Sequence, residues 1–178
     1  MFIQVIVLAI IIGFIFKGNL NNLADIKIEA LYLVVVSFLV EAMVILTIRK
    51  GLMHIGYITY FIDVFMYILL FIFVYKNRKN PYIMLMGFGF LLNAIAIFLN
   101  GGTMPVSSDA LKTAGMTFNV GSQGLYNVVG NTTKLWFLGD IFPYTFIQKN
   151  IVSVGDLVAA VGMLLFIVKG MQKSKIME

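Results

Sequence analysis

Two Gly-Asp pairs stand in the last third of the chain, Gly139-Asp140 and Gly155-Asp156. Two carboxyl groups that face one water molecule can hydrolyse a peptide bond, because one deprotonates the water while the other protonates the leaving group. Asp140 and Asp156 are 16 residues apart, and the segment between them contains Pro143. They are therefore candidates for a catalytic pair.

Other catalytic chemistries lack the residues that they need. The chain has no cysteine, which excludes disulfides and thiolate metal sites, and His54 is its one histidine. A Ser-His triad would depend on His54, which has no acidic residue close to it in the sequence. No Gly-rich phosphate loop with Lys and Ser or Thr is present. We expect neither a metal site nor a cofactor.

The composition is that of a membrane protein. Of the 178 residues, 61% are hydrophobic and 12% are charged, whereas globular domains are about 45–50% apolar and about 25% charged. The mean hydropathy is +0.98. The net charge of +5 comes from basic residues at the ends of apolar segments, a pattern typical of membrane topology rather than of nucleic-acid binding. The lipid bilayer is thus the expected partner, and nucleic acid is not.

The apolar segments predict an all-α polytopic membrane protein with a single membrane domain over residues 1–178. We expect about five transmembrane helices, at residues 2–16, 30–48, 57–75, 82–99 and 151–168. The first segment is short for a span, so a re-entrant helix is its alternative. It lacks the positive region and the Ala-x-Ala-like site of a cleaved signal peptide.

Residues 100–150 are rich in Gly, Asn, Ser and Thr and predict a long loop. Ser107-Ser108-Asp109 could cap a short helix that runs to about Met116. The aromatic residues around Pro143 favour an interfacial or re-entrant segment, so we expect the loop to be partly re-entrant.

Basic residues orient the chain in the membrane. With the N-terminus outside, eight of them fall on the inner side and five on the outer side. The inner ones are Lys17, Lys27, Lys76, Arg78, Lys79, Lys169, Lys173 and Lys175, and the outer ones are Arg49, Lys50, Lys112, Lys134 and Lys149. We therefore expect a multi-pass protein of the cell membrane with its C-terminus in the cytoplasm and residues 100–150 outside.

This topology places polar residues of four helices at one depth. Glu41, Asp63, Asn93 and Asp156 each lie five to seven residues from the outer end of their predicted helix. At 1.5 Å per residue, all four would lie about 7–11 Å inside the outer boundary. An acidic residue within a membrane span is a functional-site hypothesis by default.

Clustered carboxyl groups in a membrane cannot all ionise, because desolvation and mutual repulsion oppose it. Such a layer would hold protons, bind a cation, or attract basic residues from its rim. The alternative is that each acid is satisfied separately and only fixes helix packing. Gly155, Ala159 and Gly162 would also support packing, since they form a small-residue face on the last helix.

Asn100-Gly101-Gly102 and Pro105 predict a tight turn after the fourth apolar segment. Asn100 can hydrogen-bond backbone groups in that turn, which favours a structural role. The alternative is that Asn100 contacts a ligand at the mouth of the polar layer, together with Asp140.

The end of the chain resembles lipoprotein signal peptidase (signal peptidase II). The similarity rests on Asp140, Phe142, Pro143 and Phe146, then on Ser153-Val154-Gly155-Asp156 and Gly162. The resemblance implies that Asp140 and Asp156 are the catalytic pair at the outer face of a four-helix core. Ser153 stands where that family has an asparagine, and the first apolar segment would be additional.

Most of the chain also resembles a small bacterial family of uncharacterised integral membrane proteins. That similarity rests on Asn100-Gly101-Gly102-x-Met104-Pro105-Val106, Leu138-Gly139-Asp140-x-x-Pro143 and Ser153-x-Gly155-Asp156. It implies the membrane architecture without an activity.

The leading hypothesis is a membrane protein that binds a small ligand, a cation or protons, or that serves as an accessory membrane subunit. Its site would contain Glu41, Asp63, Asn93 and Asp156, with Asn100 and Asp140 at the mouth. The alternatives are an aspartyl-type membrane hydrolase that uses Asp140 and Asp156, and a purely structural membrane partner. Because five short helices are few for a transport path, a homo-oligomer or a partner membrane subunit is also expected.

Overall fold

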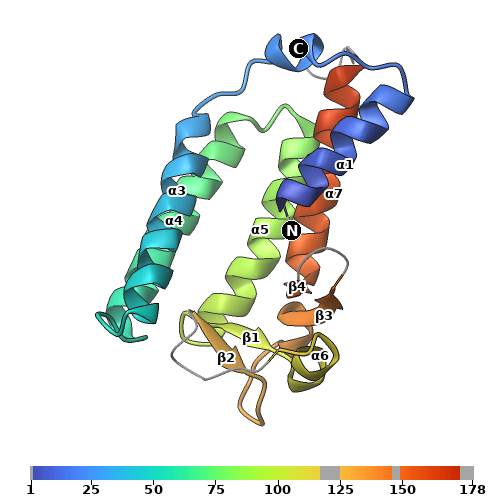
Figure 1. Cartoon of the computed structure of the whole chain (residues 1–178). Helices are drawn as coiled ribbons and strands as arrows, with labels where there is room; N and C mark the ends of the chain where they lie inside the picture. Colours follow the sequence, from blue (N-terminus) through green and yellow to red (C-terminus); the bar gives the residue numbers. More distant parts are fainter. Residues whose placement is uncertain (1, 117–124, 146–148, 173–178) are drawn as a thin grey trace.

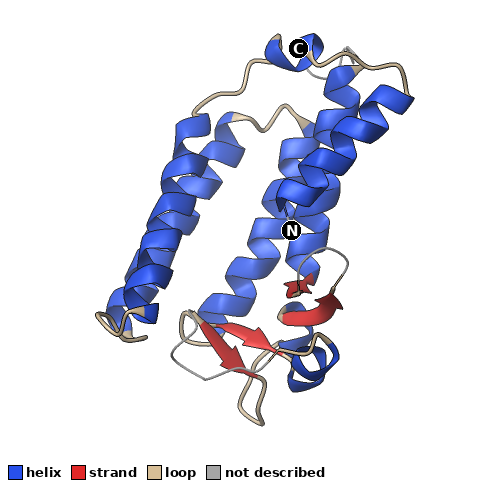
Figure 2. Ribbon diagram, viewed as in Figure 1, coloured by secondary structure: helices blue, strands red, loops and turns tan. Residues whose placement is uncertain are grey.

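The computed structural model describes residues 2–116, 125–145 and 149–172. Helices make up most of it, and a small sheet lies at one end of them (Figures 1 and 2). The helices are α1 (Phe2–Ile15), α2 (Asn21–Ala24), α3 (Leu31–Arg49), α4 (Tyr57–Lys76), α5 (Pro81–Leu99), α6 (Ser108–Thr113), η1 (Trp136–Leu138) and α7 (Val154–Met171). The strands are β1 (Met104–Val106), β2 (Tyr126–Val128), β3 (Asp140–Tyr144) and β4 (Asn150–Ser153).

Four of these helices, α3, α4, α5 and α7, are long and apolar enough to cross a membrane. Residues 50–56 and the strands lie at one end of them, here called the sheet end. Residues 16–30 and 77–80 lie at the other, here called the loop end (Figure 1). Many large apolar side chains on the outer faces of these helices are exposed, which suits contact with lipid. The predicted multi-pass architecture is thus consistent with the structure, in which four helices could span a membrane.

The fifth predicted span is shorter than the others. Helix α1 has 14 residues and rises about 21 Å, whereas the hydrocarbon core of a bilayer is about 30 Å thick. It packs beside α7 and ends at the loop end (Figure 1). Phe2 lies next to a cavity between the two ends of the bundle. That this segment spans the membrane and that the N-terminus is outside therefore stay predictions. The orientation of the chain in the membrane also stays a prediction. It rests partly on Lys173 and Lys175, which lie outside the described residues.

Asparagine side chains hold the turn between α4 and α5. Asn80 caps α5, because its Oδ1 accepts hydrogen bonds from the backbone N–H groups of Tyr82 and Ile83 at 3.0 and 3.2 Å. Pro81 occupies the first helical position, where no N–H is needed. Asn77 Nδ2 donates to the Glu29 carbonyl at 2.8 Å, and its Oδ1 accepts from the Glu29 N–H at 2.9 Å. The turn is thereby attached to the segment that leads into α3.

The four long helices form two pairs, α3 with α4 and α5 with α7 (Figure 1). In the first pair, the buried Ser37 hydroxyl donates to the Met66 carbonyl at 3.3 Å. In the second pair, the predicted small-residue face of Gly155, Ala159 and Gly162 is confirmed, because all three are buried and lie against α5.

The two pairs meet through aromatic rings and through a buried cluster of Phe73 and Val74 of α4 with Ile83 and Met86 of α5. Phe98 of α5 packs edge-on against Tyr60 and Tyr67 of α4, with ring centroids 5.6 and 5.3 Å away. The contact between α4 and α5 is smaller than the contact within either pair.

The strands form a sheet in the order β2-β1-β3-β4. Strand β1 pairs in parallel with β2 and with β3, and β3 pairs antiparallel with β4. The expectation of an all-α chain with an irregular loop over residues 100–150 is therefore wrong for this end, while the predicted short helix is present as α6 with Ser107 as its N-cap. Val106, Ala110, Leu111, Ala114 and Ile151 form a buried core between α6 and the sheet.

We expect Trp136 to lie at the membrane–water interface. It is the chain's single tryptophan, it is 53% exposed on η1, and Phe137 beside it is 49% exposed. In lipid vesicles, phospholipids brominated close to the headgroup should quench its fluorescence more strongly than phospholipids brominated near the chain ends. Equally weak quenching by both would contradict this placement and put η1 in water.

Candidate functional site

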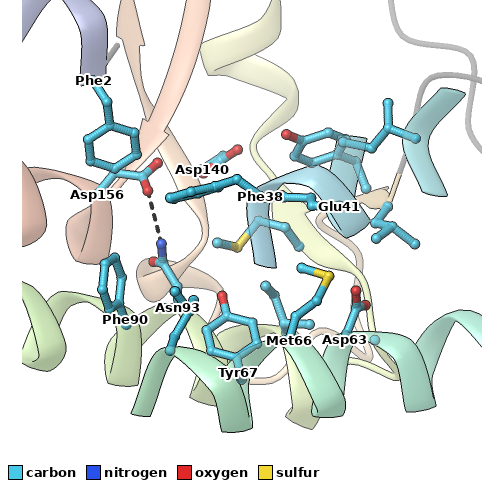
Figure 3. Close-up of a pocket in the computed structure, with 17 residues that line it drawn as sticks. Phe2, Phe38, Glu41, Asp63, Met66, Tyr67, Phe90, Asn93, Asp140 and Asp156 are labelled. Carbon is cyan, nitrogen blue, oxygen red and sulfur yellow. Dashed lines mark hydrogen bonds between the residues drawn. The ribbon is translucent and has the colours of Figure 1, made fainter. Parts of the chain in front are cut away.

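One cavity of about 300 Å³ lies between the two helix pairs and is bordered by the sheet. Its polar lining comes from every long helix and from two strands (Figure 3). The polar side chains in this lining are Glu41 of α3, Asp63 and Tyr67 of α4, Asn93 of α5, Tyr126 of β2, Asp140 of β3 and Asp156 of α7. The structure thus brings together the four residues of the predicted polar layer and adds Asp140.

Asp156 does not lie where the sequence placed it. Residues 150–153 form β4, so α7 begins at Val154 rather than at Ile151, and Asp156 is its third residue. Its Oδ2 accepts from the Ser153 N–H at 3.3 Å, while the Ser153 hydroxyl accepts from the Asp156 N–H at 2.9 Å. These two bonds form a capping box at the start of the helix. Asp156 therefore stabilises the helix N-terminus, where a negative charge is favourable.

Asn93 joins this cap to α5. Its Nδ2 donates to Asp156 Oδ1 at 2.9 Å, and its Oδ1 accepts from the Ser153 hydroxyl at 2.7 Å. Both ends of the Asn93 amide are thus used, and Figure 3 shows the bond to Asp156. Asn93 and Asp156 line the cavity as a hydrogen-bonded unit.

Asp63 and Asp140 are the most deeply buried acids in the cavity wall. Asp63 is 3% exposed and Asp140 is 6% exposed. Within the part of the chain that the structure describes, Asp63 Oδ2 and Asp140 Oδ1 are buried and have no hydrogen-bond partner. A buried polar atom without a partner costs free energy, so these two oxygens are the natural contact points for a ligand.

The carboxyl group of Asp140 is strongly affected by its surroundings. Burial raises its pKa well above the usual value, and the negative charge of Asp156 raises it further. Burial also raises the pKa of the neighbouring Tyr126 phenol, with a smaller contribution from Asp140. A positive charge in the cavity would oppose these effects.

Asn100 does not belong to the cavity. It borders a separate hollow beside Pro105 and Asn127. Its Nδ2 donates to the carbonyls of Ala96 and Lys134 at 2.7 and 2.8 Å, and its Oδ1 accepts from the Lys134 N–H at 2.9 Å. These are bonds to backbone groups, which agree with the structural interpretation of this residue, while its contact with a ligand stays a prediction.

Replacement of Asn100 by alanine should therefore destabilise the sheet end without affecting the cavity. Loss of the bonds to Ala96 and Lys134 should lower the free energy of unfolding by about 1–3 kcal/mol. Thermal unfolding in detergent measures this loss of stability. Asn131→Ala is the control, because Asn131 is exposed in the loop between β2 and η1. An Asn100→Ala protein as stable as the control would show that these bonds contribute nothing.

Sequence reasoning missed the aromatic part of the lining. Tyr67 follows Asp63 by four residues and so lies on the same helical face, which was a usable signal. Phe2, Phe38 and Phe90 also line the cavity. Tyr126 comes from a strand that the loop-like composition concealed.

The four acids do not converge on one point. Across residues 2–116, 125–145 and 149–172, no three His, Asp or Glu side chains are grouped so that they could hold a metal ion. In Figure 3, Glu41 and Asp63 lie toward one side of the cavity, and Asp140 and Asp156 lie toward the other. The arrangement therefore offers separate carboxyl groups along a wall rather than one coordination site.

Comparison with known proteins gives a family but no activity. No solved structure matches the chain. A protein of Thermotoga maritima, described as an uncharacterized protein, is 26% identical over 168 residues, which are 94% of this chain and 90% of that protein. DUF5317, a family of unknown function, matches residues 25–168. Since this match spans most of the chain, the protein belongs to the DUF5317 family.

Proposed function

We propose that this protein binds a small cationic ligand in the cavity between its helix pairs. The observation that carries the proposal is the pair of buried carboxyl oxygens, Asp63 Oδ2 and Asp140 Oδ1, which have no hydrogen-bond partner among the described residues. Both acids line the cavity and come from different elements. A donor supplied by a ligand would satisfy both oxygens.

The charge of the lining supports a cation. Half of the eight acidic residues of the chain line this cavity, and no Lys or Arg of the described chain is part of the lining. In a low-dielectric site, four carboxyl groups repel one another when ionised. A bound cation would relieve that repulsion and offset the cost of burying the charges.

The setting of the site is the membrane. Helices α3, α4, α5 and α7 could all span, and the cavity lies toward their sheet end. We propose that the sheet end faces outward in the cell membrane and that the C-terminus is cytoplasmic, because the predicted inner segments carry more Lys and Arg. A homo-oligomer or a partner membrane subunit fits the small number of helices.

Binding by the protein in detergent or nanodiscs tests the proposal. Isothermal titration calorimetry with Na⁺, K⁺, Ca²⁺, ammonium and alkylamines should reveal saturable binding of one of these cations. Asp63→Asn and Asp140→Asn should each weaken its binding about tenfold or more, because a charged hydrogen bond is lost. Asp109→Asn is the control, since Asp109 is exposed on α6, where it forms a surface ion pair with Lys112 at 3.6 Å. Failure of every cation to bind, or equal binding by all variants, would overturn the proposal.

An aspartyl hydrolase is the second candidate, since Asp140 and Asp156 line the same cavity. The hydrogen bonds of Asp156 weigh against it, because both of its oxygens already accept from Ser153 and Asn93. A general acid or base needs a carboxyl group that is free to exchange a proton with substrate or water. Cleavage of a lipid-anchored peptide by the wild type, abolished in Asp156→Asn, would reverse this order.

A further inference from the structure

We infer that the ligand is a diamine, with one amino group held at each side of the cavity. This inference rests on the proposed function and names the class of cation. A diamine is a dication at neutral pH, since alkyl ammonium groups titrate near pH 10. Each ammonium carries three hydrogen-bond donors, which suits buried carboxyl oxygens.

The first observation is that each side of the cavity has its own pair of acids. Glu41 and Asp63 come from the α3–α4 pair, and Asp140 and Asp156 come from the sheet and α7 (Figure 3). Each side has one oxygen without a partner in the described chain, Asp63 Oδ2 on one side and Asp140 Oδ1 on the other. Two separate acceptors call for two separate donor groups.

The second observation is the apolar surface between the acids. Phe38, Met66, Tyr67 and Phe90 line the cavity, and Figure 3 shows Met66 and Tyr67 between the two acidic sides and Phe90 beside Asn93 on the Asp156 side. Methylene groups pack favourably against such a surface. Aromatic faces also attract ammonium groups, so the rings favour a cationic amine over a neutral chain.

The third observation is size. The cavity of about 300 Å³ lies at the lower limit of small-molecule sites. It has room for a short alkyl chain with two amino groups. A single ion would fill little of this volume, and the acids are not grouped to hold a metal ion in the described residues.

The test is a titration series on the full chain in nanodiscs at neutral pH. Diamines of increasing chain length are compared with monoamines of the same length. We expect one optimal diamine that binds about tenfold or more tightly than its monoamine, because the second charged hydrogen bond forms only in the diamine. Asp63→Asn and Asp140→Asn should each reduce diamine binding to the level that the same variant shows for the monoamine. Asp109→Asn should change neither.

The outcomes separate this inference from the proposed function. Monoamines that bind as tightly as diamines, or diamine binding that does not depend on length, would overturn the diamine and leave a cation site. Saturable binding of a simple ion alone would do the same. Failure of all cations would overturn both. Thermal unfolding of each variant shows whether a loss of binding comes from misfolding. The conservative variants Asp63→Glu and Asp140→Glu keep the charge. They should retain the preference for a diamine, with a different optimal chain length of the diamine.

Discussion

Replacement of Gly155 by alanine is expected to lower the free energy of unfolding by about 3 kcal/mol, the upper end of what overpacking costs in a tight interior. A Cβ atom at Gly155 would lie 2.1 Å from Asn93 Oδ1 and 2.6 Å from the Gly89 carbonyl oxygen. The carbonyl belongs to the α5 backbone and cannot rotate away, so α5 and α7 must separate. Separation would also break the hydrogen bond between Asn93 and Asp156, which adds to the loss.

Unfolding of the purified protein in detergent, by heat or by a denaturing detergent, measures this effect. Gly130→Ala is the matched control, because Gly130 is exposed and a Cβ there meets nothing within 4 Å. Gly89→Ala should behave like Gly155→Ala, since its Cβ would lie 2.5 Å from the Gly155 carbonyl oxygen. If Gly155→Ala were as stable as the control, the close contact of α5 and α7 would be disproved.

The second large effect concerns pH. Burial, and then the charge of Asp156, raise the pKa of Asp140 in the folded protein above its unfolded value. The folded state therefore binds more protons than the unfolded state between these two pKa values. Stability falls as pH rises through that window, by at most about 1.4 kcal/mol per pH unit, and then levels off. Asp140→Asn cannot ionise, so the variant should be more stable than the wild type at neutral and higher pH.

The comparison requires the unliganded protein at a series of pH values. Below the usual Asp pKa of about 3.9, the two proteins should have nearly the same stability, because both are neutral at this position. The groups that face Asp140 are Asp156 of α7 and Tyr126 of β2. Asp109→Asn, with the same change of charge on the exposed α6, should show no such dependence on pH. A stability difference that is constant with pH would show that Asp140 does not titrate in this window.

The long helices were predictable because apolar runs of membrane length end at strong local signals. Helix α4 ends just before Asn77, and α5 begins at Pro81 directly after Asn80. Both boundaries are within one residue of the prediction. The beginning of α7 was wrong by three residues. Ile151 and Val152 continue the apolar pattern of the helix that follows, but residues 150–153 form β4, which pairs with β3.

The sheet could not be predicted, because its pairing is not local. Strands β1 and β2 have three residues each and pair across about twenty residues of sequence. Composition rich in Gly, Asn and Ser hides strands this short, and Pro143 within β3 argues against a strand. Tyr126 was missed for this reason, and the approach of Asp140 to the cavity could be only partly foreseen.

The grouping of Glu41, Asp63 and Asn93 at the cavity followed from depth alone. Helices of fixed rise that begin at known boundaries place their residues at calculable heights, whatever their neighbours are. The height of a residue along its helix does not say, however, in which direction its side chain points. Asn93 is held by Ser153, whereas Asp63 keeps an oxygen without a partner among the described residues, and this difference depends on packing that the sequence does not show.

The division of the bundle into two pairs has a mechanical consequence. The contacts within each pair are extensive, and the Ser153 cap of α7 is hydrogen-bonded to Asn93 of α5. The contact between the pairs is less extensive than the contact within them, with Phe98 against Tyr60 and Tyr67 toward the sheet end and the cluster of Phe73, Val74, Ile83 and Met86 toward the loop end. We therefore expect amide hydrogens near Phe98 to exchange faster than those between α5 and α7, where the contact is more extensive. A ligand that contacts both helix pairs should slow the exchange of the amide hydrogens near Phe98.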